Sequence, residues 1–420
     1  MSSKRFFFTA IASLVLVLLL LGFFNGLVDP IRLFAAPEFK GFNYFKPTFF
    51  NKHIISKPYS VSRLRPDGII LGTSRAGASL RTNHPAWSNY RAYNFSIAGS
   101  TAMVQWWNFQ HANAQTPLRR VLLSLDFFMF NACRDQAVEQ PFREYRQRLA
   151  RGDGSINWRY PKRYLVDHLV ELTSLNATRA SWQTWQMQPL FSQQGHGLLH
   201  LYEDGYWQKF PANHIDRRQG FRLIETQYMS DSWFPKPANC YSLESDGKKT
   251  QLDYLQQLLQ QAYIQGTEVI LYFSPFHARL AEAMAAMGLW EQFEQLKREV
   301  LTLNISLAKQ ANRKAYPLWD FSGYTTINTG DVPALNSPNQ TMKYYQDGSH
   351  ATQLTGRLVQ DVVFGFDAAA TRIPNDIAVQ LSEQNIESHL RQTRELREAY
   401  RRDHPEDIKE VTRMAGRILR

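Results

Sequence analysis

The chain has very little cysteine, only Cys133 and Cys240 among 420 residues. Two thiols exclude a disulfide-rich scaffold and any zinc site built from four thiolates. The 22 glycines and 19 prolines are too few for a collagenous or low-complexity chain. With 44% hydrophobic and 20% charged residues, the composition also excludes global disorder. We therefore expect an ordinary hydrophobic core, in one large domain with insertions or in two smaller domains.

Long apolar runs are missing everywhere except near the N-terminus. Residues 6–28 carry no charge, follow Lys4 and Arg5, and precede Asp29. A helix of this length crosses a bilayer core of about 30 Å, so we predict that residues 1–28 form a cytoplasmic tip and one transmembrane anchor. A cleaved signal peptide is the alternative, but no small-residue cleavage site follows Leu21.

The charges beside this run predict the topology. Lys4 and Arg5 favour a cytoplasmic N-terminus, which places residues 29–420 outside the cytoplasmic (inner) membrane, in a periplasmic or extracellular space. In that position the net charge of +11 suits anionic lipid or acidic envelope polymers, and we expect no nucleic-acid partner. Basic and aromatic residues alternate most densely over residues 143–163. This segment is interpreted either as a binding site for a polyanion or sugar, or as a solvated helix face with buried rings.

The rest of the chain predicts an α/β fold. Five short apolar runs bounded by turn residues are expected to be strands, namely residues 68–71, 91–95, 121–125, 269–273 and 315–319. Helical patterns over residues 250–265 and 278–310 precede the last two of these strands. Alternation of strand and helix is typical of a parallel sheet, so residues 29–370 are predicted to form one domain around such a sheet.

Two segments lie outside this repeating pattern. Residues 134–243 are too long for a simple connection between strands and are predicted to be an inserted subdomain that holds five tryptophans. These rings could line a binding site or fill a small core. Cys133 and Cys240 lie at the ends of the insertion and could form a disulfide or remain two free buried thiols. Residues 371–420 are polar and predict a charged, solvent-facing helical tail.

Candidate catalytic residues follow the predicted strands. Ligands of an open parallel sheet bind at the carboxyl ends of its strands. Ser74 follows the first strand, Gly99 follows the second, and the pair Asp347 and His350 follows the last. Singly, these residues could be a helix cap, a turn and another cap. Together they occur in the order that a Ser-His-Asp enzyme requires, with Asp347 orienting His350 and His350 activating Ser74.

This ordered set resembles the SGNH, or GDSL-like, hydrolase superfamily. The resemblance implies a flavodoxin-like three-layer sandwich with a five-stranded parallel sheet. It also implies a nucleophile at Ser74, an oxyanion hole from the N–H groups of Ser74 and Gly99, and no metal or cofactor. Two features depart from the family. Thr73 replaces an aspartate before the serine, and the third block, residues 124–131, lacks a clear counterpart of the family's oxyanion-binding asparagine.

Further candidates line the expected pocket. Arg75 could bind an anionic substrate or pair with Asp126, and Asp126 is expected to support the site because a carboxylate ending an apolar strand needs a partner. Asn131, at the end of the third block, and His277, after the fourth strand, are also expected near the pocket. His277 is additionally considered as a second base.

With its N-terminal anchor, the chain looks most like the membrane-tethered branch of this superfamily. That branch includes the D-alanine transfer protein of teichoic acid modification and alginate O-acetyltransferases. The resemblance implies an acyltransferase or esterase that acts on O-acyl groups of an envelope polysaccharide or polymer, in concert with a membrane-bound O-acyltransferase. A non-catalytic envelope scaffold with the same fold, and a lipase or esterase that needs no partner, are the alternatives.

Overall fold

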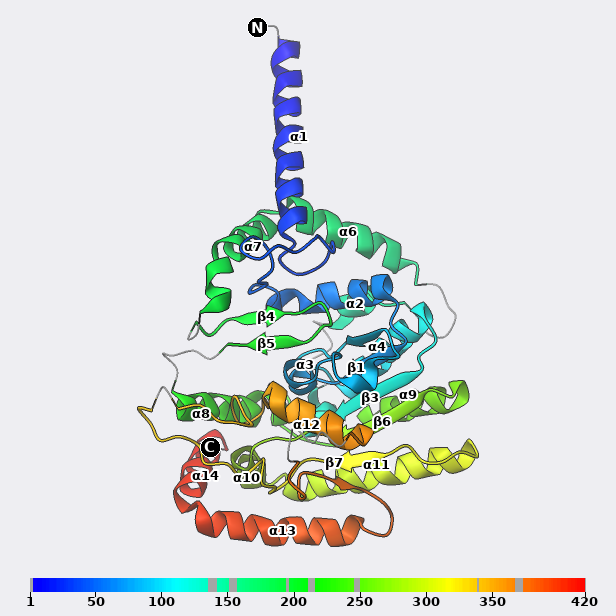
Figure 1. Ribbon diagram of the computed structural model, residues 1–420, viewed down its shortest axis with the longest axis vertical. Helices are drawn as coiled ribbons and strands as arrows, with labels where there is room; N and C mark the ends of the chain where they lie inside the picture. Colours follow the sequence, from blue (N-terminus) through cyan, green and yellow to red (C-terminus); the bar gives the residue numbers. More distant parts are fainter. Residues whose placement is uncertain are drawn as a thin grey trace.

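The computed structural model describes residues 3–134, 142–150, 157–193, 196–210, 216–244, 250–337, 340–366 and 373–419. The N-terminal helix α1 (Ser3–Val28) projects from the rest of the molecule, and its first two thirds contact no other element (Figure 1). It is the one helix of the described residues that is long and apolar enough to cross a membrane.

A six-stranded sheet forms the centre of the molecule, in the order β2-β1-β3-β6-β7-β8. Its strands are β1 (Gly68–Leu71), β2 (Ala92–Asn94), β3 (Arg120–Leu125), β6 (Glu268–Phe273), β7 (Leu318–Asp320) and β8 (Val379–Gln380). The first five in chain order run parallel, whereas β8 pairs with β7 antiparallel. The prediction of a mostly parallel sheet in an α/β fold is confirmed. The prediction of only five strands is wrong, because β8 adds an edge strand too short and polar to recognise in the sequence.

Successive strand residues face opposite sides of the sheet and enter two different cores. Ile69 and Leu71 join a large core with Phe109 of α4 (Ala102–Gln115) and residues of α9 (Gln251–Gln265) and α11 (Trp290–Gln310). Ile70 joins a second core with residues of α3 (Ser74–Ser79) and α12 (Gln353–Phe364). Because both faces are covered by helices, β1 is apolar throughout rather than alternating.

The helix boundaries follow from capping residues. Thr250 and Asp253 form a capping box at the start of α9, and Gly266 ends the helix in a left-handed conformation. The predicted helix over residues 278–310 is instead two helices, α10 (Ala278–Ala286) and α11. The break lies at Gly288, whose φ is +76°. The helical pattern of residues 278–310 continues across the turn at Gly288, so the pattern alone predicts one helix where there are two.

The predicted insertion contributes both helices and a hairpin. Its elements are α6 (Arg159–Thr173), α7 (Leu175–Gln186), the antiparallel pair β4 (Leu199–Leu201) and β5 (Trp207–Lys209), α8 (Arg217–Gln227) and a π-helical turn at Tyr228–Trp233. A disulfide between Cys133 and Cys240 closes this segment, with 5.8 Å between the two Cα atoms. Helices α6 and α7 lie across the base of α1, together with α2 (His53–Leu64) just below them (Figure 1).

The C-terminal tail forms α13 (Ile386–Asp403) and α14 (Pro405–Ile418). Its helical character agrees with the prediction, but its inner face is buried rather than solvent-facing. Arg279 of α10 is fully buried and binds Glu225 of α8 together with Asp407 and Glu410 of α14. Through this cluster the tail holds α8, which lies beside the carboxyl ends of the strands (Figure 1).

Candidate active site

The structure brings together the three residues that the sequence singled out as a triad. His350 Nε2 lies 2.9 Å from Ser74 Oγ, and His350 Nδ1 lies 2.9 and 3.0 Å from the two carboxylate oxygens of Asp347. The backbone N–H of His350 also donates to Asp347, at 2.8 Å. The carboxylate thus fixes the ring orientation and leaves Nε2 facing the serine hydroxyl.

The position of Ser74 is set by the turn that joins β1 to α3. Gly72 has a φ of +152°, and a Cβ at this residue would lie 2.6 Å from the Cβ of Ser124 on β3. Only glycine fits here, both for its backbone conformation and for space. Thr73 then caps α3 by accepting a hydrogen bond from Arg75 N, which places Ser74 in the first turn of the helix.

The loop that carries Asp347 and His350 is fixed by close packing of α12 on α3. A Cβ at Gly356 would lie 1.9 Å from the carbonyl oxygen of Ser79, at the end of α3. The two helix backbones therefore touch. This contact explains how residues 276 positions apart in the sequence come within hydrogen-bonding distance.

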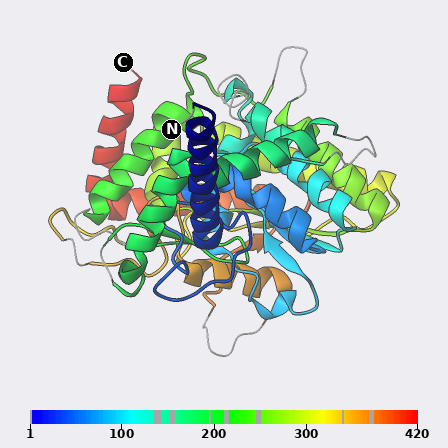
Figure 2. The same cartoon turned by 90° about the horizontal axis from the view of Figure 1, so that it is seen from above.

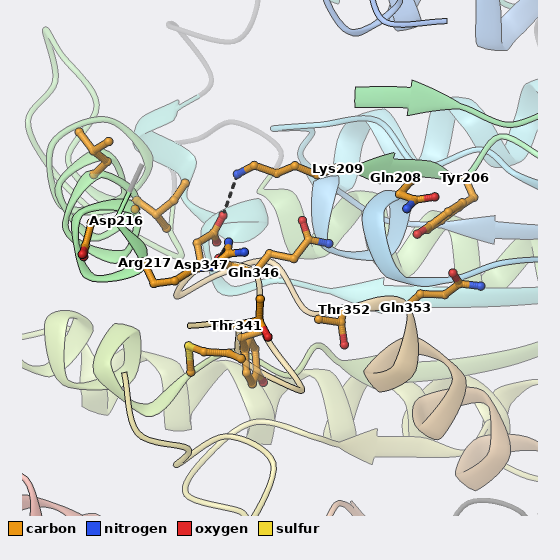
Figure 3. Close-up of a pocket in the computed structure, with 15 residues that line it drawn as sticks. Tyr206, Gln208, Lys209, Asp216, Arg217, Thr341, Gln346, Asp347, Thr352 and Gln353 are labelled. Atoms are coloured by element: carbon orange, nitrogen blue, oxygen red, sulfur yellow. Dashed lines mark hydrogen bonds and ion pairs between the residues drawn. The ribbon is translucent and has the colours of Figure 1, made fainter. Parts of the chain in front are cut away.

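Asp347 is ionised in its buried position. Burial alone would raise its pKa, but the charge and hydrogen bonds of His350, aided by the charge of Lys209, outweigh burial and hold the pKa well below its ordinary value. Lys209 Nζ lies 3.5 Å from Asp347 Oδ2, and its side chain is about half exposed. Figure 3 shows Lys209 extending from β5 toward Asp347, with Gln346 beside the carboxylate.

Ser74 and His350 open into a cavity of about 480 Å³. Gly99 lines the same cavity, and its walls are mostly apolar, formed by Phe50, Phe128, Leu199, Trp207, Ile224 and Tyr228. A second cavity of about 390 Å³ adjoins it and shares Lys209, Ile224 and Gln346 (Figure 3). The site is therefore a pocket beside the serine that continues into a second pocket beside Asp347, where Asp216, Arg217 and Gln353 are among the lining residues.

A buried hydrogen-bond network underlies the triad, and in it Arg75 pairs with Asp126. Arg75 Nη1 lies 3.2 Å from Asp126, and Arg75 Nε donates to Ser349 Oγ at 3.0 Å. Thr73 Oγ1 donates to the other oxygen of Asp126, and Tyr228 shares a hydrogen bond of 2.6 Å with Ser349. Arg75 is 6% exposed, so its guanidinium is committed to these partners rather than offered to a substrate.

Two predicted pocket residues lie elsewhere. Asn131 is fully buried and binds the backbone of Trp233, Cys240 and Ser242, so it joins the two segments that the disulfide also connects. The prediction that it borders the pocket does not match this position, because its side chain already bonds to three backbone groups of another segment.

His277 caps α10 through Nδ1 and meets the carbonyl of Gly330 through Nε2, at 2.7 Å. Burial lowers its pKa to about 4. With both ring nitrogens occupied, it cannot be a second base, because neither nitrogen faces the cavity.

Sequence reasoning missed Lys209 and Tyr228, which come from the insertion and line the cavity together with Trp207. Nothing in their local pattern marks them, since they meet Ser74 only through tertiary packing. Ser349 could have been found, because it lies inside the Asp-x-x-His motif itself. Of the five tryptophans in the insertion, Trp207 thus lines the candidate site while Trp233 is buried in a core.

Comparison of the chain with protein-family models, with curated proteins and with solved structures finds no match. Among the described residues there is also no group of three or more His, Cys, Asp or Glu side chains placed to hold a metal ion.

Proposed function

We propose that the protein is a serine-dependent O-acyltransferase or esterase of the cell envelope. The observation that carries the proposal is the chain of hydrogen bonds from Asp347 through His350 to Ser74, which opens into a cavity. A serine, an imidazole and a carboxylate in this relation form a nucleophile with its general base and orienting group.

The chemistry follows from these positions. His350 Nε2 takes the proton of Ser74 Oγ as the oxygen attacks the carbonyl carbon of an ester, and Asp347 stabilises the resulting imidazolium. The imidazolium returns the proton to the departing alcohol, which leaves an acyl group on Ser74. A hydroxyl of water or of a sugar then gives its proton to His350 as it attacks the acyl carbon. The bond to Ser74 Oγ breaks, and His350 passes the proton to Ser74 Oγ, which restores the serine and the neutral imidazole.

The oxyanion would be held by backbone N–H groups. Ser74 N lies in the first turn of α3, where no intrahelical acceptor exists, and Gly99 borders the same cavity. Each such donor contributes about 10²- to 10³-fold to the rate in serine proteases. Because Asn131 lies away from the cavity, the described residues offer no counterpart of the family's asparagine at its usual place.

The strand order supports the SGNH-like interpretation of the fold. Numbered along the chain, the five parallel strands are arranged 2-1-3-4-5, the order of flavodoxin-like sheets. At the position of the family's usual aspartate, Thr73 donates to Asp126 instead. The acidic group of this region is thus supplied from the end of β3.

We further propose that α1 is a single-pass anchor in the cytoplasmic membrane with residues 29–420 outside it. The 26-residue helix has the length and apolar character for this, Lys4 and Arg5 precede its apolar part, and the disulfide suits an oxidising compartment. The resemblance to the membrane-tethered branch then suggests an envelope polysaccharide or polymer as acceptor and a membrane-bound O-acyltransferase as partner.

A non-catalytic scaffold is the second candidate, favoured by one observation, the missing asparagine donor. Treating the full-length protein in membranes with a fluorophosphonate probe distinguishes the two. An enzyme should be labelled on Ser74, with labelling lost in Ser74→Ala and kept in Ser232→Ala, a serine lining the same cavity. Absence of labelling on Ser74 would favour the scaffold. Tracing a labelled acyl group to water or to carbohydrate then separates esterase from transferase.

A further inference from the structure

Helix α6 buries charged side chains and exposes apolar ones, the reverse of a helix on the surface of a water-soluble protein. Its buried face carries Asp167, which binds Arg148 and Tyr59, and Glu171, which binds Lys52. Both carboxylates are 5% exposed. The outward face is apolar at positions 165, 166, 169 and 170, the spacing of one helical stripe. Such a helix is arranged for an apolar environment outside the protein.

Helix α7 continues this pattern. Its buried side chains are the small residues Ala177, Ser181 and Thr184, while its large rings point outward. We define the α6–α7 face as the exposed apolar residues of these helices and the residue before α6: Trp158, Leu165, Val166, Leu169, Val170, Leu175, Trp182 and Trp185. Trp158 and Leu175 are each 80% exposed. So many exposed apolar side chains on two helices that contact each other indicate a binding face.

The α6–α7 face lies where α1 leaves the domain. Asn25 of α1 donates to Leu172 O at 2.8 Å and to Thr178 Oγ1 at 3.0 Å, so the base of α1 is bonded to both helices. Figure 1 shows α6 and α7 lying crosswise at the base of α1, and Figure 2 shows them on either side of it, seen from above.

The length of α1 fixes the distance from this face to the membrane. The uncharged residues 6–24 of α1 measure about 28 Å at about 1.5 Å per residue, close to the thickness of a hydrocarbon core. Residues 6–20 of this stretch are exposed, and Leu21, Gly22 and Phe24 are partly covered by the domain. If α1 spans the bilayer, the membrane surface therefore lies near Asn25, at the level of α6 and α7.

The basic residues around the α6–α7 face match anionic headgroups. Arg159, Lys162 and Arg179 are exposed around the apolar stripe. Tryptophan, leucine and basic residues are the composition of helices that lie in the bilayer interface. The two ends of the basic and aromatic segment 143–163 therefore differ: Tyr145 is a buried ring, whereas Trp158 is exposed. Residues 151–156 lie outside the described part of the chain.

We propose that α6 and α7 lie on the outer leaflet of the membrane that α1 crosses, with the α6–α7 face inserted among lipid headgroups. The proposal rests on the proposed anchor but not on the triad. It gives the domain two attachments, a span and an interfacial platform, which hold the cavity at a fixed height and orientation above the bilayer.

Site-specific fluorescence on the full-length protein tests this. Because both native cysteines are bonded to each other, a single added cysteine takes the label uniquely. Leu16→Cys reports on the span, Val166→Cys on the α6–α7 face, and Leu396→Cys on exposed α13 as a distal control. Each variant, carrying a polarity-sensitive dye, is placed in nanodiscs of phosphatidylcholine and phosphatidylglycerol, with and without nitroxide-labelled lipids.

We expect a shallow nitroxide to quench the dye at position 166, a deep nitroxide to quench the dye at position 16, and neither to affect position 396. Adding Leu165→Glu and Leu169→Glu should expose the dye at position 166 to water and abolish its quenching, while the dye at position 16 stays quenched. Quenching at 16 without quenching at 166 would overturn the interfacial platform and leave the anchor intact. Protection of 166 that requires an added membrane protein would overturn it in favour of a protein partner. Absence of quenching at 16 would overturn both.

Discussion

At the scale of single residues, Arg75 connects the two halves of the candidate site. Its guanidinium joins Asp126, at the end of β3, to Ser349, which precedes His350. It also lies over the ring of Phe276, 4.8 Å from the ring centre. A planar fork can serve the three contacts at once, whereas a lysine ammonium is a compact point charge. Arg75 is therefore a positioning residue that holds the serine turn and the histidine loop in register.

We predict that Arg75→Lys lowers kcat on an activated ester by about ten-fold or more with little change in KM, because small displacements of reacting groups are costly. The charge is kept but the bond to Ser349 is lost. Steady-state kinetics give the measurement, and Arg81→Lys, which pairs with Asp204 away from the triad, is the matched control. A raised KM with unchanged kcat would mean that Arg75 binds substrate instead.

His277 illustrates how a buried histidine couples stability to pH. Its pKa is lowered to about 4 by burial, against about 6.5 in an unfolded chain. Below pH 6.5 the unfolded chain binds the proton more readily, so the stability from this residue is complete above pH 6.5. It is lost as the pH falls toward 4.

We predict that His277→Asn flattens the fall in unfolding free energy between pH 7 and pH 4.5. Asparagine can still cap α10 but cannot titrate. At most about 3 kcal/mol of pH-dependent stability should disappear, which is the free-energy equivalent of a pKa of about 4 in the folded chain against about 6.5 in the unfolded chain. Urea unfolding of the full chain in detergent at several pH values measures the slope. An unchanged slope would show that other groups account for the acid sensitivity.

At the scale of elements, the sequence predicted the strands that carry the site better than it predicted their surroundings. The runs at 68–71, 121–125 and 269–273 match β1, β3 and β6 to within one residue, because buried parallel strands are continuously apolar. The predicted fifth strand, residues 315–319, begins three residues before β7 (Leu318–Asp320), since Pro317 lies within an apolar run that only partly pairs.

Contacts between distant elements could not be predicted. The triad was found because its residues follow strand ends, and such ends share one edge of a parallel sheet. Lys209 and Trp207 reach the site from an insertion whose docking no local pattern encodes. The packing of Gly356 against Ser79 could not be predicted from the sequence either, because a glycine within a helix indicates only lower helix stability.

We predict that Gly356→Ala separates α12 from α3 and damages the site without touching a triad residue. The new methyl group would overlap the Ser79 carbonyl, a backbone atom that cannot move aside cheaply. Overpacking of this kind costs about 1–3 kcal/mol. Thermal unfolding and ester hydrolysis should both decline, whereas Gly416→Ala on α14, where a Cβ meets open space, should leave both unchanged. Full activity in Gly356→Ala would contradict the role given to this contact.

At the scale of the whole molecule, the disulfide and the C-terminal helices hold the insertion against the sheet. Cys133 and Cys240 close the segment that supplies Trp207, Lys209 and Tyr228 to the lining of the cavity. The buried Arg279 fastens α8 to both α10 and α14. The insertion and tail are thus parts of the site's scaffold, although in the sequence they look like additions to a core fold.

We predict that replacing both cysteines by serine destabilises the protein by about 2–5 kcal/mol, the range expected when a bridge closing a loop of 107 residues is removed. Chemical denaturation of the two forms measures the difference. Because Trp207 and Tyr228 depend on the insertion, substrate KM should rise as well. Equal stability with and without the bridge would show that packing alone closes the insertion.

We predict that Ser74, His350 and Asp347 act as one catalytic unit, which the rates of ester cleavage in single and double variants measure. Since groups that act together lose activity together, Ser74→Ala and His350→Ala should each cost about as much as the double variant, and Asp347→Asn should cost less. All should keep the wild-type fold by circular dichroism. Losses that multiply in the double variant, or an undiminished rate in Ser74→Ala, would contradict the account.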